Sequence, residues 1–335
     1  MRWYPWLRGD FERLMSLYQS GRGHHALLLH AQAGLGDDAL IYALSRWLMC
    51  QQPDGNKSCG KCRGCQLMQA GTHPDYHVIT PEKGKSTLGI DPVRQVTEAL
   101  YGRARQGGAR VVWIPDAGWL TEAAANALLK TLEEPPQACW FFLGTREPEK
   151  LLATLRSRCL YWYLAPPEES YALAWLAREA PGDRAQLQAA LRLSMGAPAA
   201  ALELLEPEQW QRRNALCNAL GEALNQRDML SLLAQLNDDR VLQRLQWLSS
   251  LLLDALKWQQ GAAAWLMNGD MQPVVAQCAG QLSTTAIHAI LHSLLCCRER
   301  LAEVAGVNRE LLLTEFLLSW EHLMRPGAIV AGSQL

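Results

Sequence analysis

The chain has 335 residues, and a single domain built around one hydrophobic core is usually shorter than this. Two or three domains are therefore expected. Its composition, 49% hydrophobic and 19% charged, is ordinary for a folded soluble protein. Because the formal net charge is −1, no strong whole-molecule field attracts nucleic acid or an anionic membrane. Any contact with DNA must therefore come from a local patch or through partner subunits.

Membrane insertion and secretion are not expected for this sequence. No apolar run reaches the roughly 18 residues that suggest a membrane span, and the charged N-terminus does not resemble a signal peptide. Of the ten cysteines, four cluster at a metal-type spacing. The other six lie mostly in apolar segments, where reduced thiols are expected. The predicted location is the cytoplasm.

Short apolar runs alternate with helical patterns in the first half of the chain. Strands are predicted at residues 25–30, 76–80, 111–114 and 140–143. Apolar residues on one side predict helices at 37–49, 93–101 and 122–133, and a proline pair closes the last of these. This alternation indicates a mostly parallel sheet covered by helices on both faces.

The second half of the chain shows only helical patterns, and Pro166 and Pro167 mark where it begins. We expect three domains: an α/β domain at 1–166, a small helical domain at 167–207 and a helical domain at 208–335. A wide apolar stripe in the last of these favours burial against several helices or a subunit interface. It contains Leu245, Trp247, Leu248, Leu251, Leu252, Leu256 and Trp258.

The segment AQAGLGDD, between the first strand and its helix, has the position of a phosphate-binding loop. That loop has the pattern G-x-x-x-x-G-K-[ST], in which backbone amides and the lysine bind phosphate and the hydroxyl binds magnesium. Here Ala31 replaces the first glycine, Gly34 lies within the loop and Gly36 keeps the second glycine. Asp37 replaces the lysine and Asp38 the Ser/Thr.

The two aspartates oppose nucleotide binding. A carboxylate in place of an ammonium repels a polyphosphate, and a close charge pair is worth on the order of 4 kcal/mol at an effective dielectric near 20. Asp38 beside Asp37 makes a poor magnesium–nucleotide site. By itself, the segment is also compatible with a plain strand–helix turn whose acidic start suits the helix dipole.

More specific motifs follow downstream. A working nucleotide site has acidic residues at the end of a second strand, for magnesium and for the attacking water, and this chain has Pro115 and Asp116 there. Residues 126–136 read NALLKTLEEPP, and after the next strand a T-R-E-P turn leads to Ser157-Arg158-Cys159.

Together these motifs resemble the bacterial clamp-loader subunits of the AAA+ class, and the resemblance covers the whole chain. It implies an AAA+ α/β domain with a parallel sheet, a small helical lid and an all-α collar. In that family, ATP lies between neighbouring subunits of an incomplete ring. Carried over, Arg158, framed by Ser157 and Cys159, reaches the γ-phosphate of a neighbour's ATP.

The resemblance also places two sensor positions. Thr145 stands at the first, and the second falls at residues 196–200, where Ala200 replaces an arginine. The implied role is a stator that has no ATP in its own site and no intrinsic ATPase activity. The implied partners are the tau/gamma ATPase subunits and the delta subunit, with sliding clamp and primer–template DNA contacted through the complex. The DNA-directed DNA polymerase (nucleotidyltransferase) activity then belongs to the holoenzyme.

Two other functions stay open on the residues alone. One is an active phosphate-loop ATPase, against which Asp37 argues. The other is a zinc-containing nucleic-acid-binding protein acting alone, which the near-zero net charge and the lack of a basic run disfavour. Without its flanking motif, Arg158 would be an ordinary surface or interface arginine.

An insert at about residues 50–66 carries cysteines at the spacing C-x8-C-x2-C-x2-C. Four thiolates satisfy tetrahedral zinc and leave no open position, which predicts a structural Zn²⁺ site. The insert is too polar to fold on apolar burial alone, so a metal would order it. An iron–sulfur cluster is the alternative, but the bacterial C-x3-C-P ending is absent. His73 and His77 are interpreted as ordinary polar residues, so the predicted ligands are Cys50, Cys59, Cys62 and Cys65.

Overall fold

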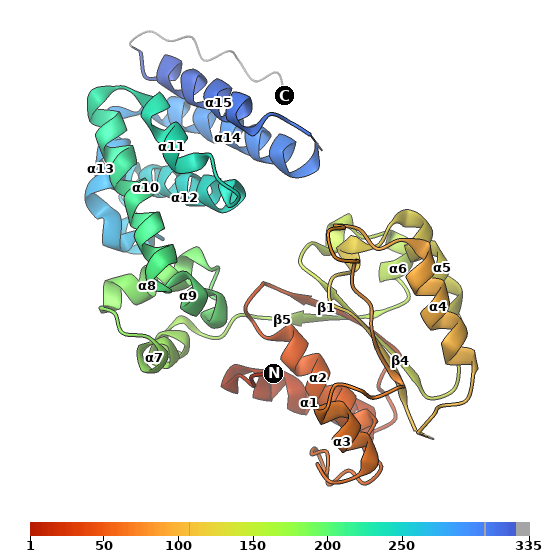
Figure 1. Cartoon of the computed structure of the whole chain (residues 1–335). Helices are drawn as coiled ribbons and strands as arrows, with labels where there is room; N and C mark the ends of the chain where they lie inside the picture. Colours follow the sequence, from red (N-terminus) through yellow and green to blue (C-terminus); the bar gives the residue numbers. More distant parts are fainter. Residues whose placement is uncertain (107, 305, 326–335) are drawn as a thin grey trace. The chain divides into compact units, whose positions relative to one another are not determined.

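A computed structural model describes residues 1–106, 108–304 and 306–325. The chain divides into two compact units, Met1–Pro167 and Glu168–Leu335. In the first unit, helices and strands alternate along the chain (Figure 1). Its strands are β1 (Ala26–Ala31), β2 (Tyr76–Val78), β3 (Arg110–Ile114), β4 (Cys139–Thr145) and β5 (Leu160–Leu164). Its α-helices are α1 (Arg8–Gln19), α2 (Asp37–Leu48), α3 (Arg63–Gln69), α4 (Ile90–Tyr101), α5 (Glu122–Glu133) and α6 (Ala153–Arg156). Its short 3₁₀ turns are η1 (Pro5–Leu7), η2 (Ala117–Trp119) and η3 (Pro148–Lys150).

The five strands form one parallel sheet in the order β2-β3-β4-β1-β5. Strand β1 lies between β4 and β5, with His30 opposite Thr145 and Leu27 opposite Leu160. Parallel strands covered on both faces need nearly continuous apolar sequences, and the central strands have them. All five residues of β3 are buried, as are all but one in β1.

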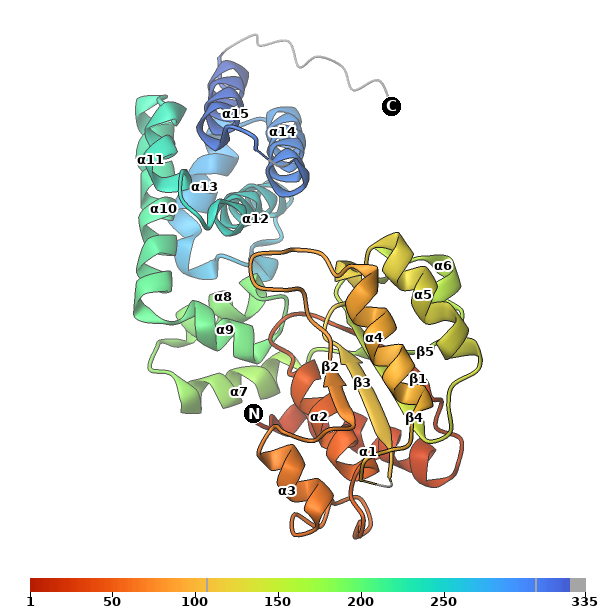
Figure 2. The ribbon, with the colours of Figure 1, turned by 45° about the vertical axis from the view of Figure 1, so that its right-hand side comes forward.

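Alternate residues of each strand serve the two faces of the sheet. Ala26 and Leu28 of β1, with Phe141 and Leu143 of β4, share one buried cluster with α4, α5 and α6. Figure 2 shows these three helices on one face of the sheet and α1 and α2 on the other. The result is a three-layer α/β/α arrangement that exposes the carboxyl ends of the strands at one edge.

The predicted α/β class is confirmed, and several predicted elements agree with the structure within a few residues. The helix predicted at 122–133 is α5, and the strand predicted at 111–114 falls within β3. The sequence patterns did not predict α1, α3, α6 or β5. Strand β5 lies at the edge of the sheet and exposes Tyr161 and Tyr163, so it has no continuous apolar run. Helix α3 begins at Arg63, with Cys62 as its N-cap, inside an insert whose polar, turn-forming sequence does not predict a helix.

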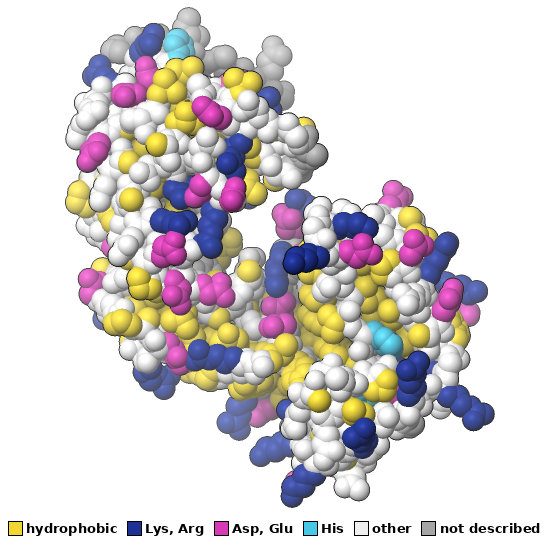
Figure 3. All heavy atoms as spheres, in the orientation of Figure 1, with side chains coloured by type: hydrophobic (Ala, Val, Ile, Leu, Met, Phe, Trp, Pro, Cys, Tyr) yellow, Lys and Arg dark blue, Asp and Glu magenta, His cyan; other side chains and the backbone are white. Residues whose placement is uncertain are grey.

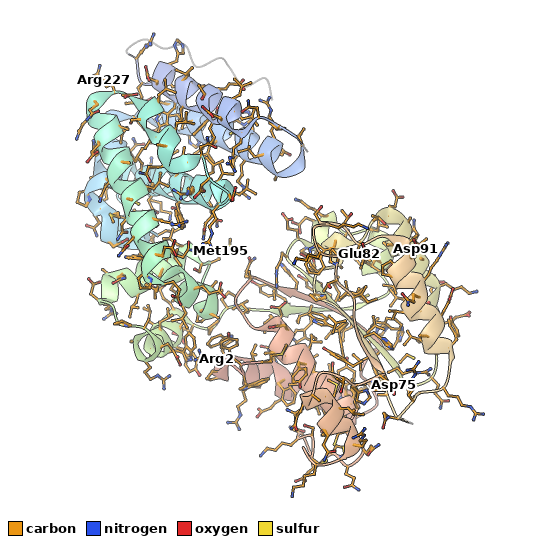
Figure 4. The ribbon with its side chains drawn as sticks, viewed as in Figure 1. Arg2, Asp75, Glu82, Asp91, Met195 and Arg227 are labelled. Atoms are coloured by element: carbon orange, nitrogen blue, oxygen red, sulfur yellow. The ribbon has the colours of Figure 1, made fainter. Side chains whose placement is uncertain are left out.

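The second unit is entirely helical in its described residues. A first group comprises α7 (Glu169–Glu179), α8 (Arg184–Leu193) and α9 (Pro198–Leu204). The rest comprises α10 (Pro207–Gln226), α11 (Leu233–Leu236), α12 (Val241–Gln259), α13 (Gln272–Gln281), α14 (Thr284–Glu303) and α15 (Arg309–Leu323). Short 3₁₀ turns are η4 (Met229–Leu232), η5 (Ala263–Trp265) and η6 (Gly269–Met271). Met195 and Arg227, both labelled in Figure 4, follow α8 and α10 with positive φ angles of 52° and 56°, so each ends a helix in the left-handed conformation.

The apolar stripe predicted near residue 250 lies on α12 and packs against α10, α13 and α14. Its members from Leu245 to Leu252 are buried, whereas Leu256 and Trp258 are half-buried. Most of the stripe is therefore buried by helices of the same unit. A buried polar cluster lies beside it: the fully buried Arg213 pairs with Asp270, and Asn268 Nδ2 donates to Asp254 at 2.9 Å.

Lysine and arginine side chains are scattered over the face of the molecule in Figure 3 and form no continuous basic surface there. Within the described residues, no single helix is long and apolar enough to cross a membrane. Residues Gly269–Gln281 and Thr284–Ala302 meet that test of length and composition only together, as a pair bent by 111°.

Candidate functional site

The loop between β1 and α2 has the position of a phosphate loop in the fold, but Asp37 and Asp38 replace its lysine and Ser/Thr. Gly34 and Gly36 adopt positive φ angles of 83° and 85°, and Gly36 caps α2. Asp37, the first residue of α2, is buried, whereas Asp38 is exposed. The helix N-terminus that would attract a phosphate is thus already occupied by the chain's own carboxylates.

Asp37 is neutralised by an arginine from the neighbouring strand end. Arg146, directly after β4, places its guanidinium 3.0 Å from Asp37 Oδ2. The same guanidinium donates to the carbonyl oxygen of Ala31 at 2.8 Å. Where a nucleotide-binding loop has a lysine reaching for phosphate, this loop has a carboxylate paired with an arginine. The charges needed for nucleotide binding are therefore reversed and internally compensated.

The N-terminal segment packs directly on the same loop. Trp6 Nε1 donates to the carbonyl oxygen of Leu35 at 2.8 Å, and the rings of Tyr4 and Trp6 stack with centroids 4.7 Å apart. A Cβ at Gly36 would come within 2.5 Å of the Tyr4 ring. Packing against Tyr4 is therefore a reason for glycine here that is independent of any phosphate.

The buried charge of Asp37 gives a pH-dependent prediction. Burial raises the pKa of Asp37 above 3.8, although Arg146 acts to lower it. A carboxyl with a raised folded-state pKa binds protons more readily in the folded chain, so its contribution is most favourable at low pH and is lost as the pH rises through the folded pKa. Asp37→Asn is therefore expected to raise the free energy of unfolding at pH 7, and this gain should shrink as the pH falls towards 4.

Urea unfolding of both proteins between pH 4 and 8 measures this difference. The exposed neighbour provides a matched control, because Asp38→Asn changes the same group at the surface and should give a much smaller pH-dependent difference. A clear loss of stability for Asp37→Asn at pH 7 would show that the pair with Arg146 outweighs the cost of burial.

At the neighbouring strand end, Pro115 and Asp116 occupy the positions where a working nucleotide site has acidic residues. Pro115 has no side-chain ligand, and Asp116 Oδ1 instead accepts the Gly118 N–H at 2.8 Å as the cap of η2. Thr145, at the first sensor position, is buried, and its hydroxyl accepts the Glu147 N–H at 3.2 Å.

A cavity of about 490 Å³ borders these strand ends, with Asp116, Thr145, Arg146 and Lys150 in its wall. Ala200 lies in α9 and offers no charge.

Arg158 lies near the amino ends of the strands, whereas the loop after β1 lies at their carboxyl ends. It follows α6 and precedes β5, whose first residue, Leu160, pairs with Leu27 near the start of β1. The phosphate-type loop follows the opposite end of β1, after Ala31. Since a strand rises about 3.3 Å per residue, roughly 15 Å of sheet separates Arg158 from its own loop. Arg158 is therefore too far away to contact its own loop.

The residues that frame Arg158 have structural contacts. Ser157 Oγ donates to the carbonyl oxygen of Thr154 at 3.1 Å, which closes the turn after α6. Cys159 packs against the core beneath α5 and α6, and burial raises the pKa of its thiol to about 12. Cys159 is therefore an anchor and not a nucleophile. Arg158 itself bonds to Glu133, the last residue of α5.

The four predicted cysteine ligands come together. Their sulfur atoms all lie within 4.8 Å of one another, with Cys50 and Cys62 3.9 Å apart and Cys59 and Cys65 4.0 Å apart. Four sulfurs at about 2.3 Å from a tetrahedral zinc would lie about 3.8 Å apart, so the set fits such an ion. Two are buried and two half-buried. With all four positions of a tetrahedral ion filled by sulfur, no coordination position would be left for a substrate.

Backbone amides around the cluster favour thiolates. The Cys59 N–H points at Cys50 Sγ at 3.2 Å, and the Cys62 N–H at Cys59 Sγ at 3.3 Å. Although burial acts to raise it, the pKa of Cys62 is lowered to about 6 by the Cys65 N–H and other hydrogen bonds.

His73 and His77 lie outside the described cluster. His73 is buried, and its Nδ1 accepts the Asp75 N–H at 3.2 Å, so it has a structural contact.

Three contacts around these sites were not predicted from the sequence. Arg146 and Glu133 lie in the recognised motifs, but neither was given a role. A buried acidic residue at the start of α2 implies a cation nearby, and that signal could have identified Arg146 within T-R-E-P. No sequence signal indicated that Tyr4 and Trp6 would pack on the loop.

Comparison with known proteins agrees with this architecture. Residues 8–168 match the family model described as DNA polymerase III, delta subunit, and residues 207–322 match its C-terminal counterpart. Residues 167–206 match the DNA polymerase III subunit delta', AAA+ ATPase lid domain. The chain is 60% identical to the DNA polymerase III subunit delta' of Escherichia coli over 98% of both proteins, and 58% identical to that of Yersinia pestis, again over 98% of both.

Among solved structures, the chain also aligns with the DNA polymerase III, gamma subunit-related protein of Thermotoga maritima. It has a TM-score of 0.46 at 19% identity, covering 94% of this chain and 99% of that one.

The parallel sheet, the loop in the phosphate-loop position and the matched lid define a protein of the AAA+ class. Within that class, the near-complete matches leave one assignment. The chain belongs to the DNA polymerase III delta' subunit family, which confirms the predicted family and fold.

Proposed function

We propose that this chain is a non-hydrolysing stator of the DNA polymerase III clamp loader, which helps to load the sliding clamp onto primed DNA. The observation that carries the proposal is the arrangement of two sites at opposite ends of the same strands. At the carboxyl ends, Asp37 is paired with Arg146 where a nucleotide would need positive charge. At the amino ends, Arg158 lies beyond the reach of that loop and partly exposed, available to a neighbour's ATP.

The partners that we propose are the tau/gamma ATPase subunits and the delta subunit, in one hetero-oligomeric ring in the cytoplasm. Clamp and primer–template DNA would be contacted through the complex, in keeping with the net charge of −1. We retain the division into an AAA+ domain at 1–166, a lid at 167–207 and an oligomerisation collar at 208–335. Exposed leucines on the last helices support the collar, among them Leu295 and Leu311 at 52% and 65% exposure.

We also propose that the cysteine cluster holds one structural zinc. All four donors of the cluster are sulfur, and the insert around it contributes little apolar surface of its own. Bound there, zinc would tie the end of α2 to the start of α3. It would have no part in ATP chemistry.

The proposal is tested by nucleotide titration of the isolated chain together with assembly. Calorimetric titration with Mg-ATP is expected to show no saturable heat, because Asp37 replaces the phosphate-binding lysine and Pro115 removes a magnesium ligand. The same preparation is expected to co-elute with the ATPase and delta subunits in gel filtration.

The ATPase subunit alone is the positive control for the titration. Micromolar binding of Mg-ATP by this chain would overturn the stator role, whereas millimolar binding would leave it intact. Failure to co-elute, combined with a DNA gel shift by the isolated chain, would favour the nucleic-acid-binding alternative instead.

A further inference from the structure

The guanidinium of Arg158 is held in place by hydrogen bonds within this chain. Nε donates to Glu133 Oε1 at 2.7 Å, and one terminal nitrogen donates to the same oxygen. The other terminal nitrogen donates to the carbonyl oxygen of Thr154 at 2.7 Å. The Arg158 side chain nevertheless keeps 30% of its surface exposed. It is thus oriented and still accessible.

Glu133 is fixed by a rigid part of the fold. It is the last residue of α5, whose Leu128 and Leu132 are packed in the core cluster under the sheet. Glu134 and the two prolines that follow end the helix and lead the chain into β4. The carboxylate therefore extends from a well-anchored point towards the turn that carries Arg158, 25 residues further along the chain.

Stability does not explain this carboxylate. A negative charge in the last turn of a helix is unfavourable, because the helix dipole places partial negative charge there. The pair is also partly exposed, at 30% and 50% of the two side chains, and ion pairs at the surface contribute little to stability. What Glu133 does provide is one defined orientation for a long, flexible side chain at the surface.

We propose that Glu133 is a positioning residue for Arg158, a role that rests on the trans action proposed above. By accepting hydrogen bonds from Nε and a terminal nitrogen of the guanidinium, Glu133 keeps Arg158 in one orientation before a neighbour's ATP arrives. The entropic cost of ordering the Arg158 side chain then falls on folding and not on the transition state. The activation free energy is lower as a result, and turnover is faster. Arg158 acts on the phosphate, and Glu133 acts only through Arg158.

Glu133→Ala, assembled with wild-type partners, is therefore expected to slow clamp loading about tenfold, because misplacing a charge-stabilising group costs one to two orders of magnitude. The loss should appear in kcat, with the KM for ATP nearly unchanged, since the contact matters in the transition state. Glu133→Gln keeps the accepting oxygen and should recover part of the rate. Glu134→Ala is the matched control: it removes the same charge one residue along and should have no effect.

A double-mutant comparison separates this proposal from the trans role itself. If Glu133 acts through Arg158, Glu133→Ala should have no further effect in the Arg158→Ala background. A slow Arg158→Ala ring with a normal Glu133→Ala ring would overturn the positioning role and keep the trans role. Normal rates for both would overturn the two together. A Glu133→Ala ring faster than wild type would show a restraining role and would also reject the proposal.

An NMR measurement on the isolated chain tests the contact without any partner. The Arg158 Nε–Hε signal is expected to exchange slowly with water in the wild type and rapidly in Glu133→Ala, because the accepting oxygen is gone. Equal exchange rates in the two proteins would contradict the contact on which the proposal depends.

Discussion

Cys62→Ser is expected to abolish metal binding by the purified chain, which should otherwise carry close to one zinc. The sulfur spacing of 3.9–4.0 Å suits a four-thiolate site, and an alkoxide-type oxygen is a poor substitute for a thiolate at such a centre. Binding at structural zinc sites is worth about 10–16 kcal/mol in isolated finger peptides, so loss of one ligand has a large effect on occupancy. Elemental analysis after purification without chelator measures the zinc content.

The structural consequence should be local. The insert docks on the rest of the domain through Trp47 Nε1 and Gln19 Nε2, which donate to the Gly55 carbonyl oxygen at 2.9 and 3.1 Å. Without metal these few polar contacts are expected to be insufficient, so trypsin should cleave rapidly after Lys57 and Lys61. The sheet core is built from other residues and should keep most of its stability.

Cys296→Ser is the matched control for this experiment, because it makes the same chemical change at an exposed position on α14. It should leave zinc content and proteolysis unchanged. Iron in place of zinc, no metal at all, or full zinc content in Cys62→Ser would each reject the proposed site.

The sequence predicted the local parts of this molecule well, because they depend on neighbouring residues. Alternating apolar runs indicated the parallel sheet, and the C-x8-C-x2-C-x2-C spacing predicted four thiols that the structure brings together. Replacement of the loop lysine by Asp37 indicated an unfavourable phosphate site, and the same aspartate is buried in an internal ion pair.

What the sequence did not predict depends on chain segments far apart. Arg146 reaches Asp37 only because β4 lies beside β1 in the sheet, and this strand order is not encoded in any local pattern. The contact between Glu133 and Arg158 likewise requires the end of α5 and the turn before β5 to lie side by side. Strand β5 was missed because an edge strand with exposed tyrosines lacks the apolar run that marks buried strands.

Arg158→Ala is expected to impair clamp loading strongly while leaving folding and ring assembly intact. A trans-acting arginine stabilises charge on the transferred phosphoryl group, and such residues supply roughly 10³–10⁵-fold in related systems. Its side chain is partly exposed and bonds to an exposed glutamate, so its removal should cost little stability.

The effect should differ between the two activities of the ring. Only one ATP site faces this chain in the proposed arrangement, so DNA-stimulated ATP hydrolysis should fall only in part. Loading should fall further if the sites act in concert. Arg158→Lys should restore little, because a point charge cannot reproduce a planar fork that also bonds Glu133 and Thr154.

Arg156→Ala provides the control that separates a specific role from a general loss of positive charge. Arg156 is the last residue of α6, two positions away and exposed at the same edge of the sheet. Each variant is assembled with wild-type partners, checked by gel filtration and assayed for loading. Normal loading and normal ATP hydrolysis with Arg158→Ala would reject the trans role, whereas equal losses for both variants would point to a general electrostatic effect at this edge. Only a loss confined to Arg158 agrees with an arginine that acts on a neighbour's nucleotide.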